Sequence, residues 1–443
     1  MKVKTLTIND PIHGIMELED LPFISIRSII GHPLFTRLRH IKQLGLADLV
    51  FPGGVHTRFI HSIGAAHLAK RILYRVQPNA STEMFGYVVL ATLLHDIGHG
   101  PFSHAFEKLT QKPEIELITH EAWTDYFIKE IVHSLPIEVL NLISALITKS
   151  STIPKEYQLI ADIISSQLDA DRLDYLLRDS YFCGVTYGKY DINWLLHCMQ
   201  AIPDECSRLR LGVSKRGVGA VEDFFMARRL MTHNVYHNQT VDLLQLLTMH
   251  FLDICCNFIY DAAVQNLCPP ILKKFLEGLF LYQTKQIPKH AFMSVYFASY
   301  QRLSDPMIFQ WIEIVAFYPG HLPENLKTLG KRIYLRHLPK VFYVPKENIA
   351  PITTALTQLK HEYNYPIWQL GIEVNKFMTY SSHQGPILVQ DKKVVPITEE
   401  SLFMKAMMDK QESSHYVYID KELLNSQHIK NFIRDFLYTN QDY

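Results

Sequence analysis

Four residues of metal-binding types stand out in the chain. His95 and Asp96 are adjacent at the end of an apolar segment, and together they can bind one divalent metal ion from one side. His61 upstream and Asp171 downstream could complete the coordination. Two nitrogen and two oxygen ligands suit manganese, iron, cobalt, nickel, zinc or magnesium without selecting one of them. Incomplete coordination leaves room for a water molecule, whose pKa the metal lowers until it is a nucleophile at neutral pH.

The residues around the first three ligands predict that helices position them. Apolar residues recur every four positions over residues 58–76, which predicts an amphipathic helix that carries His61. Residues 84–95 are apolar on all sides, which indicates a buried helix that ends near Gly98 and Gly100-Pro101. A single histidine on a helix is more often a satisfied or exposed group, so the joint pattern carries the prediction of a metal site.

A third helix, predicted over residues 157–179, carries the last ligand. Asp171, Tyr175 and Asp179 are spaced by four residues and therefore share one face of this helix. A face made of an acid, a phenol and an acid packs poorly in an apolar core. It favours a polar cavity.

The rest of the chain predicts a mainly α fold, a helical bundle followed by a C-terminal α+β lobe. The extended start is predicted over residues 1–20, with a turn at 10–14. Other predicted elements are helices over 121–132, 137–147, 221–259 (broken near Asn238) and 326–336, a strand over 341–345, a hairpin over 386–397, and a helical tail from 399. We expect a core over 1–240, a helical extension over 241–335 and an α+β lobe for interaction or assembly over 336–443.

Composition excludes several classes of protein. The 443 residues are 48% hydrophobic and 20% charged, and their net charge is zero, which argues against strong nucleic-acid binding. The N-terminus lacks the apolar core of a signal peptide, and no apolar stretch reaches the ~20 residues of a membrane span. The six cysteines form no CxxC pair and are expected to be free thiols. We therefore expect a cytoplasmic protein.

Several motifs in order resemble the HD phosphohydrolase superfamily, in particular its deoxynucleoside triphosphate triphosphohydrolase branch. The resemblance includes the catalytic core of the sterile-alpha-motif-linked members, is strong over residues 9–240 and is weak to the C-terminus. The motifs that carry it are Asn9-Asp10-Pro11-Ile12-His13-Gly14, Arg37 to Gly45, Phe51-Pro52-Gly53, His56 to Ser62, His95 to His104, Thr119-His120-Glu121 and Asp169 to Asp179.

The resemblance implies a role for each matching residue. His61, His95, Asp96 and Asp171 would hold one divalent metal ion, and additional magnesium would accompany the nucleotide. His104, oriented by Glu107, and His120 would do acid–base work on the leaving oxygen. The residues that would contact phosphates are Arg58, His99, His104, Arg172 and Tyr175. Gln43 and Leu44 would face the sugar, and Asp179 would accept from its 3′-hydroxyl. Arg228 and Tyr236 also match the pattern of substrate-binding residues, and the Tyr236 ring would crowd a 2′-hydroxyl. The implied reaction is attack of water at the α-phosphorus, which yields a deoxynucleoside and triphosphate.

The resemblance also implies partners. Asn9 and Arg39 match residues of a regulatory nucleotide site at a subunit interface, in a homodimer or homotetramer. Leu6 and Gly31 stand where the nucleotide-activated members have a lysine and an aspartate, and Thr232 stands where they have a histidine near the substrate. A need for a nucleotide activator is therefore left open.

Two alternatives remain beside this reading. One is an HD phosphohydrolase that acts on a nucleoside monophosphate, a cyclic nucleotide or guanosine tetraphosphate. The other is a nucleotide-sensing scaffold on an HD fold without catalysis. The intact set of candidate ligands argues against the scaffold, and the long match through Tyr236 argues against a minimal HD domain.

Overall fold

A computed structural model of the chain describes residues 4–150, 152–382, 385 and 387–437. These residues form two compact units, and each unit gathers segments that are distant in the sequence. Unit 1 contains residues 1–236, 270–308 and 379–410, and unit 2 contains residues 237–269, 309–378 and 411–443. The sequence instead predicts three consecutive segments, divided at residues 240 and 335, and that division stays a prediction.

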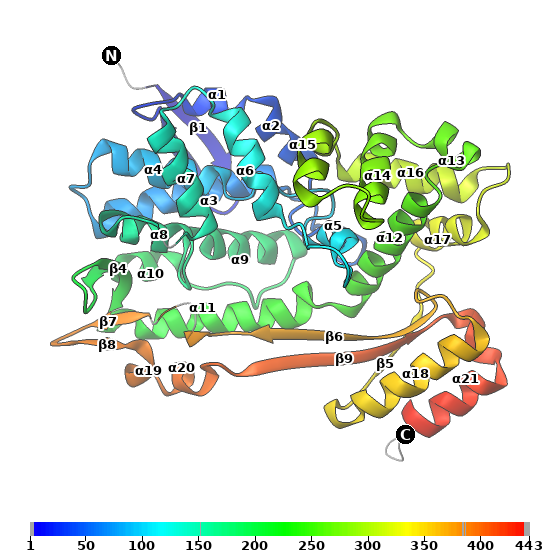
Figure 1. Cartoon of the computed structure of the whole chain (residues 1–443). Coiled ribbons are helices and arrows are strands. Elements are labelled where there is room, and N and C mark those ends of the chain that lie inside the picture. Colours follow the sequence, from blue (N-terminus) through cyan, green and yellow to red (C-terminus); the bar gives the residue numbers. More distant parts are fainter. Residues whose placement is uncertain (1–3, 151, 383–384, 386, 438–443) are drawn as a thin grey trace. The chain divides into compact units, whose positions relative to one another are not determined.

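Unit 1 is built mainly from helices (Figure 1). Its longer helices are α3 (Arg58–Val76), α4 (Thr82–Leu94), α6 (His120–Ile131), α7 (Ile137–Thr148), α9 (Ala170–Cys183), α11 (Val218–Met231), α14 (Pro270–Gln283) and α15 (Lys289–Tyr300). Its shorter ones are α1 (Ile26–Ile30), α2 (Pro33–Thr36), α5 (His104–Glu107), α8 (Gln158–Ile164), α10 (Ile192–Cys198), α19 (Ile397–Glu400) and α20 (Leu402–Met407). The helix α16 (Asp305–Phe317) begins in unit 1 and ends in unit 2. The predicted mainly α fold is confirmed.

The centre of unit 1 is α3, which packs against both α4 and α9 (Figure 1). The buried side chains of α3 include Ile63, Leu68 and Ile72, in agreement with the predicted amphipathic pattern. The helix α4 is almost wholly buried over its last eight residues, as its continuous apolar sequence predicts. It ends at Leu94, so that His95 and Asp96 lie where the chain leaves the helix. The three segments that carry the candidate ligands are therefore neighbours.

The predicted helix over residues 157–179 was wrong in its continuity. The chain forms α8 and α9 instead, with a break between Ile164 and Ala170. The Asp169 carboxylate accepts hydrogen bonds from the backbone amides of Arg172 (2.8 Å) and Ser166 (3.0 Å), and so caps the start of α9. The predicted break near Asn238 is confirmed, because Asn238 caps the next helix in the same manner.

Two small sheets complete unit 1. The strands β1 (Thr5–Asp10) and β2 (Gly14–Glu19) form the antiparallel hairpin that the N-terminal sequence predicts. The second sheet has the order β3-β4-β7-β8, with β3 (Met199–Pro203), β4 (Leu209–Ser214), β7 (Leu388–Gln390) and β8 (Val394–Pro396). The predicted hairpin over 386–397 is confirmed at β7 and β8, and Pro386 lies outside the described residues. The sequence reading missed β3 and β4.

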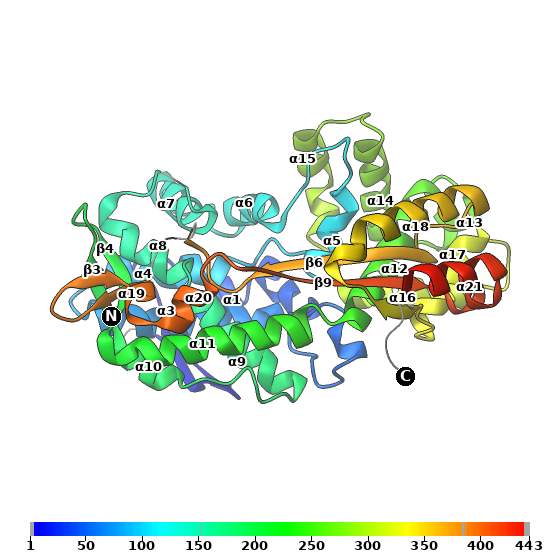
Figure 2. The same cartoon turned by 90° about the horizontal axis from the view of Figure 1, so that it is seen from below.

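Unit 2 combines helices with a three-stranded sheet. Its helices are α12 (Gln239–Asn257), α13 (Ala262–Leu267), α17 (Glu324–Tyr334), α18 (Ile349–Tyr363) and α21 (Gln427–Phe432). The antiparallel sheet has the order β5-β9-β6, with β5 (Lys340–Tyr343), β6 (Leu370–Met378) and β9 (Gln411–Ile419). The long strands β6 and β9 lie side by side in both views (Figures 1 and 2). The predicted helical tail was wrong at β9, because pairing with β6 extends these residues.

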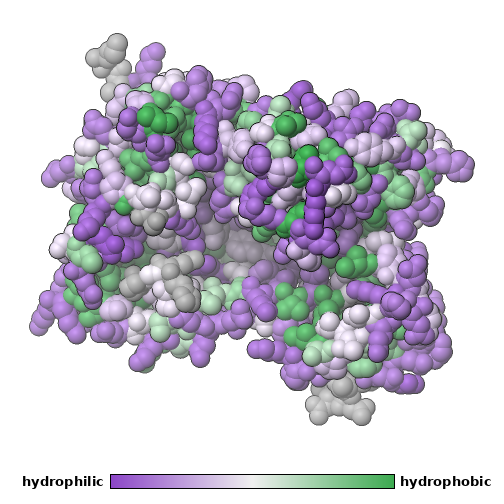
Figure 3. Space-filling model, viewed as in Figure 1, coloured by the Kyte–Doolittle hydropathy of each residue, from purple (hydrophilic) through white to green (hydrophobic). Residues whose placement is uncertain are grey.

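Hydrophilic and apolar side chains are mixed on the face of the molecule that Figure 3 shows. Hydrophilic side chains cover much of the face in Figure 3, and apolar side chains form smaller clusters between them. Within the described residues, none of the helices combines the length and the apolar character that crossing a membrane requires. The six cysteines are free thiols, as the sequence predicts.

Candidate metal centre

The four predicted ligands converge. The Nε2 atom of His61 lies 3.1 Å from Oδ1 of Asp171 and 3.6 Å from Oδ2 of Asp96. The Nε2 atom of His95 lies 3.4 Å from Oδ1 of Asp96 and 3.4 Å from the same Asp171 oxygen. Side chains from α3, the end of α4 and the start of α9 therefore meet at one place.

Two buried nitrogen atoms test whether this place fits a cation. Among the described residues, neither Nε2 of His61 nor Nε2 of His95 has a hydrogen-bond partner. Buried polar atoms are nearly always paired, so two unpaired atoms that face the same carboxylates call for a ligand. Ligand atoms of His61, His95 and Asp96 lie within 4.8 Å of one another, which suits a shared ion. The donor set fits a divalent metal and does not select one.

A second layer of residues orients His61. Its Nδ1 donates to Oδ2 of Asp174 (2.8 Å), and because a carboxylate only accepts, Nδ1 carries the proton and Nε2 is free for a cation. Asp174 also accepts from Nε2 of His13 (2.6 Å) and from Nε and Nη2 of Arg178 (2.8 Å each). Gly64 allows this close approach, since a Cβ there would lie 2.1 Å from an Asp174 oxygen.

His95 is oriented in the same manner by the backbone. Its Nδ1 donates to the carbonyl oxygen of Thr92 (2.6 Å), which again leaves Nε2 unprotonated in the neutral ring. Both imidazoles thus present the same atom toward the carboxylates. Partners of this kind raise the basicity of a metal-binding histidine and hold its ring in place.

Negative charge dominates the centre when no cation neutralises it. Burial lowers the pKa of His61, but the close carboxylates of Asp171 and Asp174 outweigh this effect and raise the pKa to about 10. Burial opposes the ionisation of Asp96 as well, yet the nearby Arg58 and His95 hold its pKa well below the usual range. The carboxylates therefore stay ionised and attract positive charge, which a proton or a metal ion can supply.

Arg58 borders the centre. Its Nη1 donates to Oδ2 of Asp96, and its Nε donates to the hydroxyl of Ser103 (2.9 Å). The side chain is buried, so its charge acts in a medium that screens it weakly. A cation fixed in this way can stabilise charge that develops on a phosphate next to the metal.

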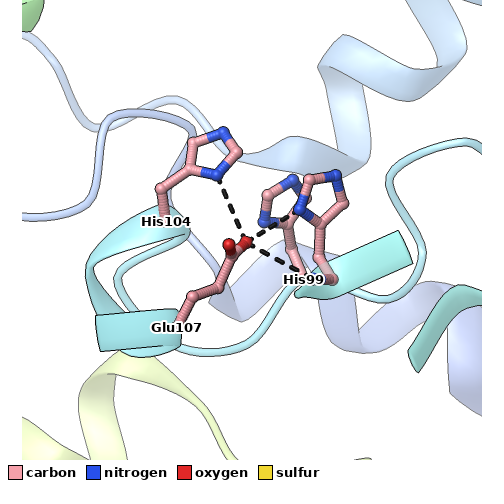
Figure 4. Close-up of side chains that lie close together, drawn as sticks. His99, His104 and Glu107 are labelled. Atoms are coloured by element: carbon pink, nitrogen blue, oxygen red, sulfur yellow. Dashed lines mark hydrogen bonds and ion pairs between the residues drawn. The ribbon is translucent and has the colours of Figure 1, made fainter. Parts of the chain in front are cut away.

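The predicted acid–base residues form a second cluster with His99, and Figure 4 labels its members His99, His104 and Glu107. The Glu107 carboxylate accepts from Nδ1 of His104 (3.2 Å) and from Nδ1 of His120 (2.8 Å). Burial would raise the pKa of Glu107, but these two hydrogen bonds lower it to about 2. His104 is the exposed member, with 69% of its side chain accessible, as a proton donor to a bound substrate must be.

His99 joins the two clusters. Its ring stacks on His120 at 3.7 Å, and its Nε2 lies 3.4 Å from Oδ1 of Asp96. Burial, together with the charges of Arg58 and His120, holds the pKa of His99 well below its usual value. His99 is therefore a neutral ring at pH 7, and the described residues offer no hydrogen-bond partner to its Nδ1.

Two of the predicted substrate-binding residues, Asp179 and Tyr236, meet at the far end of α9. Asp179 accepts from the hydroxyl of Tyr236 (2.9 Å) and from Nε2 of His56 (2.6 Å). The ring of Tyr236 lies 6.0 Å from that of Tyr175, edge to face. His56 had no predicted role, although it precedes His61 in one of the motifs. This arrangement holds the Tyr236 ring next to the face that also carries Asp171.

Two predicted substrate-binding residues, Arg172 and Arg228, are held by contacts outside the metal centre. Arg172 pairs with Asp169 at the start of α9, and Nη1 of Arg228 donates to the carbonyl oxygen of Thr379 (3.2 Å). Burial lowers the pKa of Arg228; Tyr175 partly offsets this effect, and the charge of Arg172 adds to it. The two cations therefore share one region, where an anion would be stabilised.

The two predicted residues ahead of α3 are half-buried or buried. Oε1 of Gln43 is buried without a hydrogen-bond partner among the described residues, and Leu44 is half-buried. The contacts of these residues with a phosphate or a sugar stay predictions, as do those of Arg172 and Arg228.

The second layer around the metal centre was missed from the sequence. Asp10, His13, Asp174 and Arg178 all lie in the recognised motifs, but nothing in their spacing assigned them to His61. Arg178 donates from Nη1 to Oδ2 of Asp10 (2.7 Å), and both side chains are buried. The available signal was the spacing of Asp174 and Arg178, which are four residues apart on one helix, because a buried charge needs a partner.

Comparisons with known proteins agree with this geometry. A family model described as HD domain matches residues 58–179, the range that contains all four candidate ligands. An uncharacterised protein of Mycoplasma pneumoniae is 31% identical over 324 residues, which cover 69% of this chain and 76% of that protein. Human deoxynucleoside triphosphate triphosphohydrolase SAMHD1 is 30% identical over 281 residues, which cover 55% of this chain and 44% of the human protein.

A solved structure extends the match over the fold. The crystal structure of a phosphohydrolase from Bacteroides thetaiotaomicron matches with a TM-score of 0.77 at 25% identity. The match covers 94% of this chain and 100% of that one. The similarity to SAMHD1, by contrast, spans less than half the length of the human protein.

Proposed function

Because the chain belongs to the HD-domain family of phosphohydrolases, we propose that it hydrolyses deoxynucleoside triphosphates to a deoxynucleoside and triphosphate. Water attacks the α-phosphorus in this reaction, and a divalent metal is required. The observation that carries the proposal is the hydrogen bond from Tyr236 to Asp179, a residue of the helix that also supplies Asp171. A sugar-reading pair at that position suits a nucleotide whose α-phosphate lies at the metal.

His61, His95, Asp96 and Asp171 would hold the metal, which when bound supplies Lewis acidity for the activation of water and neutralises phosphate charge. Asp174 keeps the proton of His61 on Nδ1 and so keeps Nε2 directed at the cation. Arg58 stands against Asp96 and meets the negative charge that builds on the α-phosphate.

The histidine cluster handles the proton of the leaving group. His104 is accessible, and Glu107 orients it through Nδ1, so that Nε2 is free to face the leaving oxygen. Glu107 shares its carboxylate with His120, and the ionised acid stabilises a positive charge on either ring. The role of His104 in this scheme is that of a general acid, and Glu107 and His120 position it.

Sugar discrimination rests on a steric argument. Asp179 accepts a hydrogen bond from the hydroxyl of Tyr236, and His56 holds the other oxygen of Asp179. Movement of the Tyr236 ring would therefore break a hydrogen bond. A 2′-hydroxyl would have to displace this ring, whereas a deoxyribose would not. The buried and unpaired Oε1 of Gln43 is available to accept from the substrate.

A product assay tests the proposal. The purified protein is incubated with each of the deoxynucleoside and ribonucleoside triphosphates, with Mg²⁺ or Mn²⁺, singly and in pairs so that any activator is present. We expect equimolar deoxynucleoside and triphosphate by anion-exchange chromatography. Release of phosphate or pyrophosphate without triphosphate contradicts the proposal and favours another nucleotide as substrate.

Metal-site variants provide the control for this assay. His95→Ala and Asp96→Ala should lose the bound metal and at least about a thousandfold in kcat, because both the Lewis acid and its charge are removed. Asp125 is a partly exposed residue of α6 whose carboxylate pairs with Lys129, and the control variant Asp125→Asn should keep both the metal and kcat. Elemental analysis with full metal in the two alanine variants would refute the ligand assignment.

A further inference from the structure

Two residues between the metal centre and the histidine cluster adopt an unusual backbone conformation. Phe102 has φ 56° and Ser103 has φ 57°, in the left-handed region that side chains other than glycine rarely occupy. Such conformations persist only where the surrounding structure holds them. Ser103 directly precedes His104, so the backbone conformation of Ser103 determines the position of the predicted general acid.

Hydrogen bonds tie Ser103 to two other parts of the centre. Its hydroxyl donates to the carbonyl oxygen of Lys42 (2.9 Å) and accepts from Nε of Arg58 (2.9 Å). The turn after Lys42 approaches closely, since a Cβ on Gly45, whose φ is +57°, would lie 2.9 Å from the carbonyl oxygen of Phe102. The positions of Arg58, His104 and the turn that carries Gln43 are therefore linked.

One buried carboxylate joins both backbone segments. Oδ1 of Asp305 accepts from the amide of Phe102 (2.8 Å), and Oδ2 accepts from the amide of Lys42 (2.9 Å). Asp305 is 1% exposed and is the first residue of α16, 203 positions after Phe102 in the sequence. Both oxygens are thus used on the two loops.

Neighbouring side chains hold the same loop from other directions. The hydroxyl of Tyr300, at the end of α15, donates to the carbonyl oxygen of Gly98 (2.7 Å). Arg37 donates to the carbonyl oxygens of Ile97 (3.0 Å) and His99 (2.8 Å). These contacts hold the carbonyl groups at the start of the loop. Within this set, Asp305 alone accepts from its far end, at Phe102.

We propose that Asp305 is a positioning residue for the proposed hydrolysis: its carboxylate holds the Lys42 turn and the Phe102–Ser103 segment together, and thereby places Arg58 and His104 relative to the metal centre. The segment 270–308 would then have a function in catalysis without contact with the substrate. The effect on activity rests on the proposed function, but the effect on the two loops does not.

The charged groups around Asp305 define how this contact depends on pH. Lys42 attracts its charge, Asp48 repels it, and the buried Arg37 interacts with it favourably. Burial is the largest effect and, with Asp48, raises the pKa of Asp305 to about 7, although the two amide bonds and Lys42 oppose this. Protonation converts one acceptor oxygen to a hydroxyl and weakens one of the two contacts. Both amide contacts are therefore complete only above about pH 7, although the raised pKa means that ionisation of the buried carboxyl itself costs the folded state stability.

The variant Asp305→Asn tests the proposal, because its amide nitrogen cannot accept from a backbone N–H. We expect kcat to fall about ten- to hundredfold with little change in KM and in metal content, as positioning errors near 1 Å do. In the wild type, kcat should rise between about pH 6 and pH 8 as Asp305 ionises, and this rise should be lost in the variant. The matched control is Asp48→Asn, which removes the neighbouring acid but leaves both amide contacts.

Hydrogen exchange supplies a readout that needs no substrate. In Asp305→Asn, the peptides that contain Lys42 and Phe102 should exchange about tenfold faster than in the wild type, and in Asp48→Asn they should not. Burial raises the pKa of Asp305 above that of an exposed aspartate, so its ionisation costs the closed state stability. Wild-type protection of the same peptides, corrected for intrinsic rates, should therefore decrease from about pH 6 to pH 8, which covers the case of a variant that fails to fold. Unchanged exchange in Asp305→Asn together with pH-independent protection overturns the proposal, whether or not triphosphate is released.

Discussion

At the scale of single residues, Tyr236 determines whether the centre distinguishes two kinds of sugar. Its hydroxyl donates to Asp179 and its ring packs near Tyr175. If the ring excludes a 2′-hydroxyl by its volume, Tyr236→Ala should raise the ratio of ribonucleotide to deoxyribonucleotide kcat/KM about tenfold or more. The measurement is that ratio for one base, in parallel for both sugars.

The variant Tyr236→Phe separates the ring from its hydroxyl. It retains the volume and loses only the hydrogen bond to Asp179, so we expect discrimination within about threefold of the wild type. A ratio that does not change in Tyr236→Ala would remove this residue from sugar selection. A change in the phenylalanine variant as large as in the alanine variant would assign selection to the hydroxyl.

At the scale of elements, the break between α8 and α9 places Asp171 at the metal centre. Asp169 caps α9 through the amides of Arg172 and Ser166 and also pairs with the Arg172 side chain. Asp169→Ala should therefore lower the free energy of unfolding by about 2 kcal/mol or more, as loss of a cap and of a buried ion-pair partner requires. Denaturant unfolding followed by circular dichroism measures this change.

A second N-cap provides the comparison. Asp191 caps the short helix α10 by accepting from the amide of Trp194 (2.9 Å), and its side chain is exposed. Asp191→Ala should cost only about 0.5–1 kcal/mol. Equal losses in the two variants would show that the buried pairing at Asp169 adds nothing to its role as a cap.

At the scale of the whole molecule, the chain separates metal binding from a second core. All four candidate ligands lie in unit 1, while unit 2 has its own apolar cluster, which includes Leu356, Val417 and Ile429. Unit 2 also contains a buried ion pair, in which Nη1 of Arg332 donates to Oδ1 of Asp420 (2.9 Å). A change in this pair should therefore affect unit 2 first.

Replacement of Arg332 by alanine leaves Asp420 buried and unpaired, which should destabilise unit 2 by about 3–5 kcal/mol. Calorimetry should show one unfolding transition, that of unit 2, at a lower temperature than in the wild type. The purified variant should retain its metal below that temperature. Arg434→Ala, which removes an exposed ion pair of the same unit, should leave the profile unchanged. Metal loss from the folded Arg332→Ala protein would contradict the independence of the two units.

The sequence by itself determined the helices that carry the ligands, because helical periodicity, apolar runs and chain-breaking glycines act within a few residues of one another. The spacing of His61, His95-Asp96 and Asp171, read with these helices, was enough to predict that they meet. Local signals could not reveal β6 and β9, because each strand is stabilised by a partner more than thirty residues away.

Only the tertiary structure decided which residues support the ligands. Asp174 orients His61, Asp179 holds Tyr236, and Asp305 reaches back to Lys42 and Phe102. In the sequence, Asp174 and Asp305 look like solvated charges, and Asp179 is expected at the site but without a link to Tyr236. Packing buries all three, and a buried charge is stable only where distant donors are brought to it, which is a property of the folded chain.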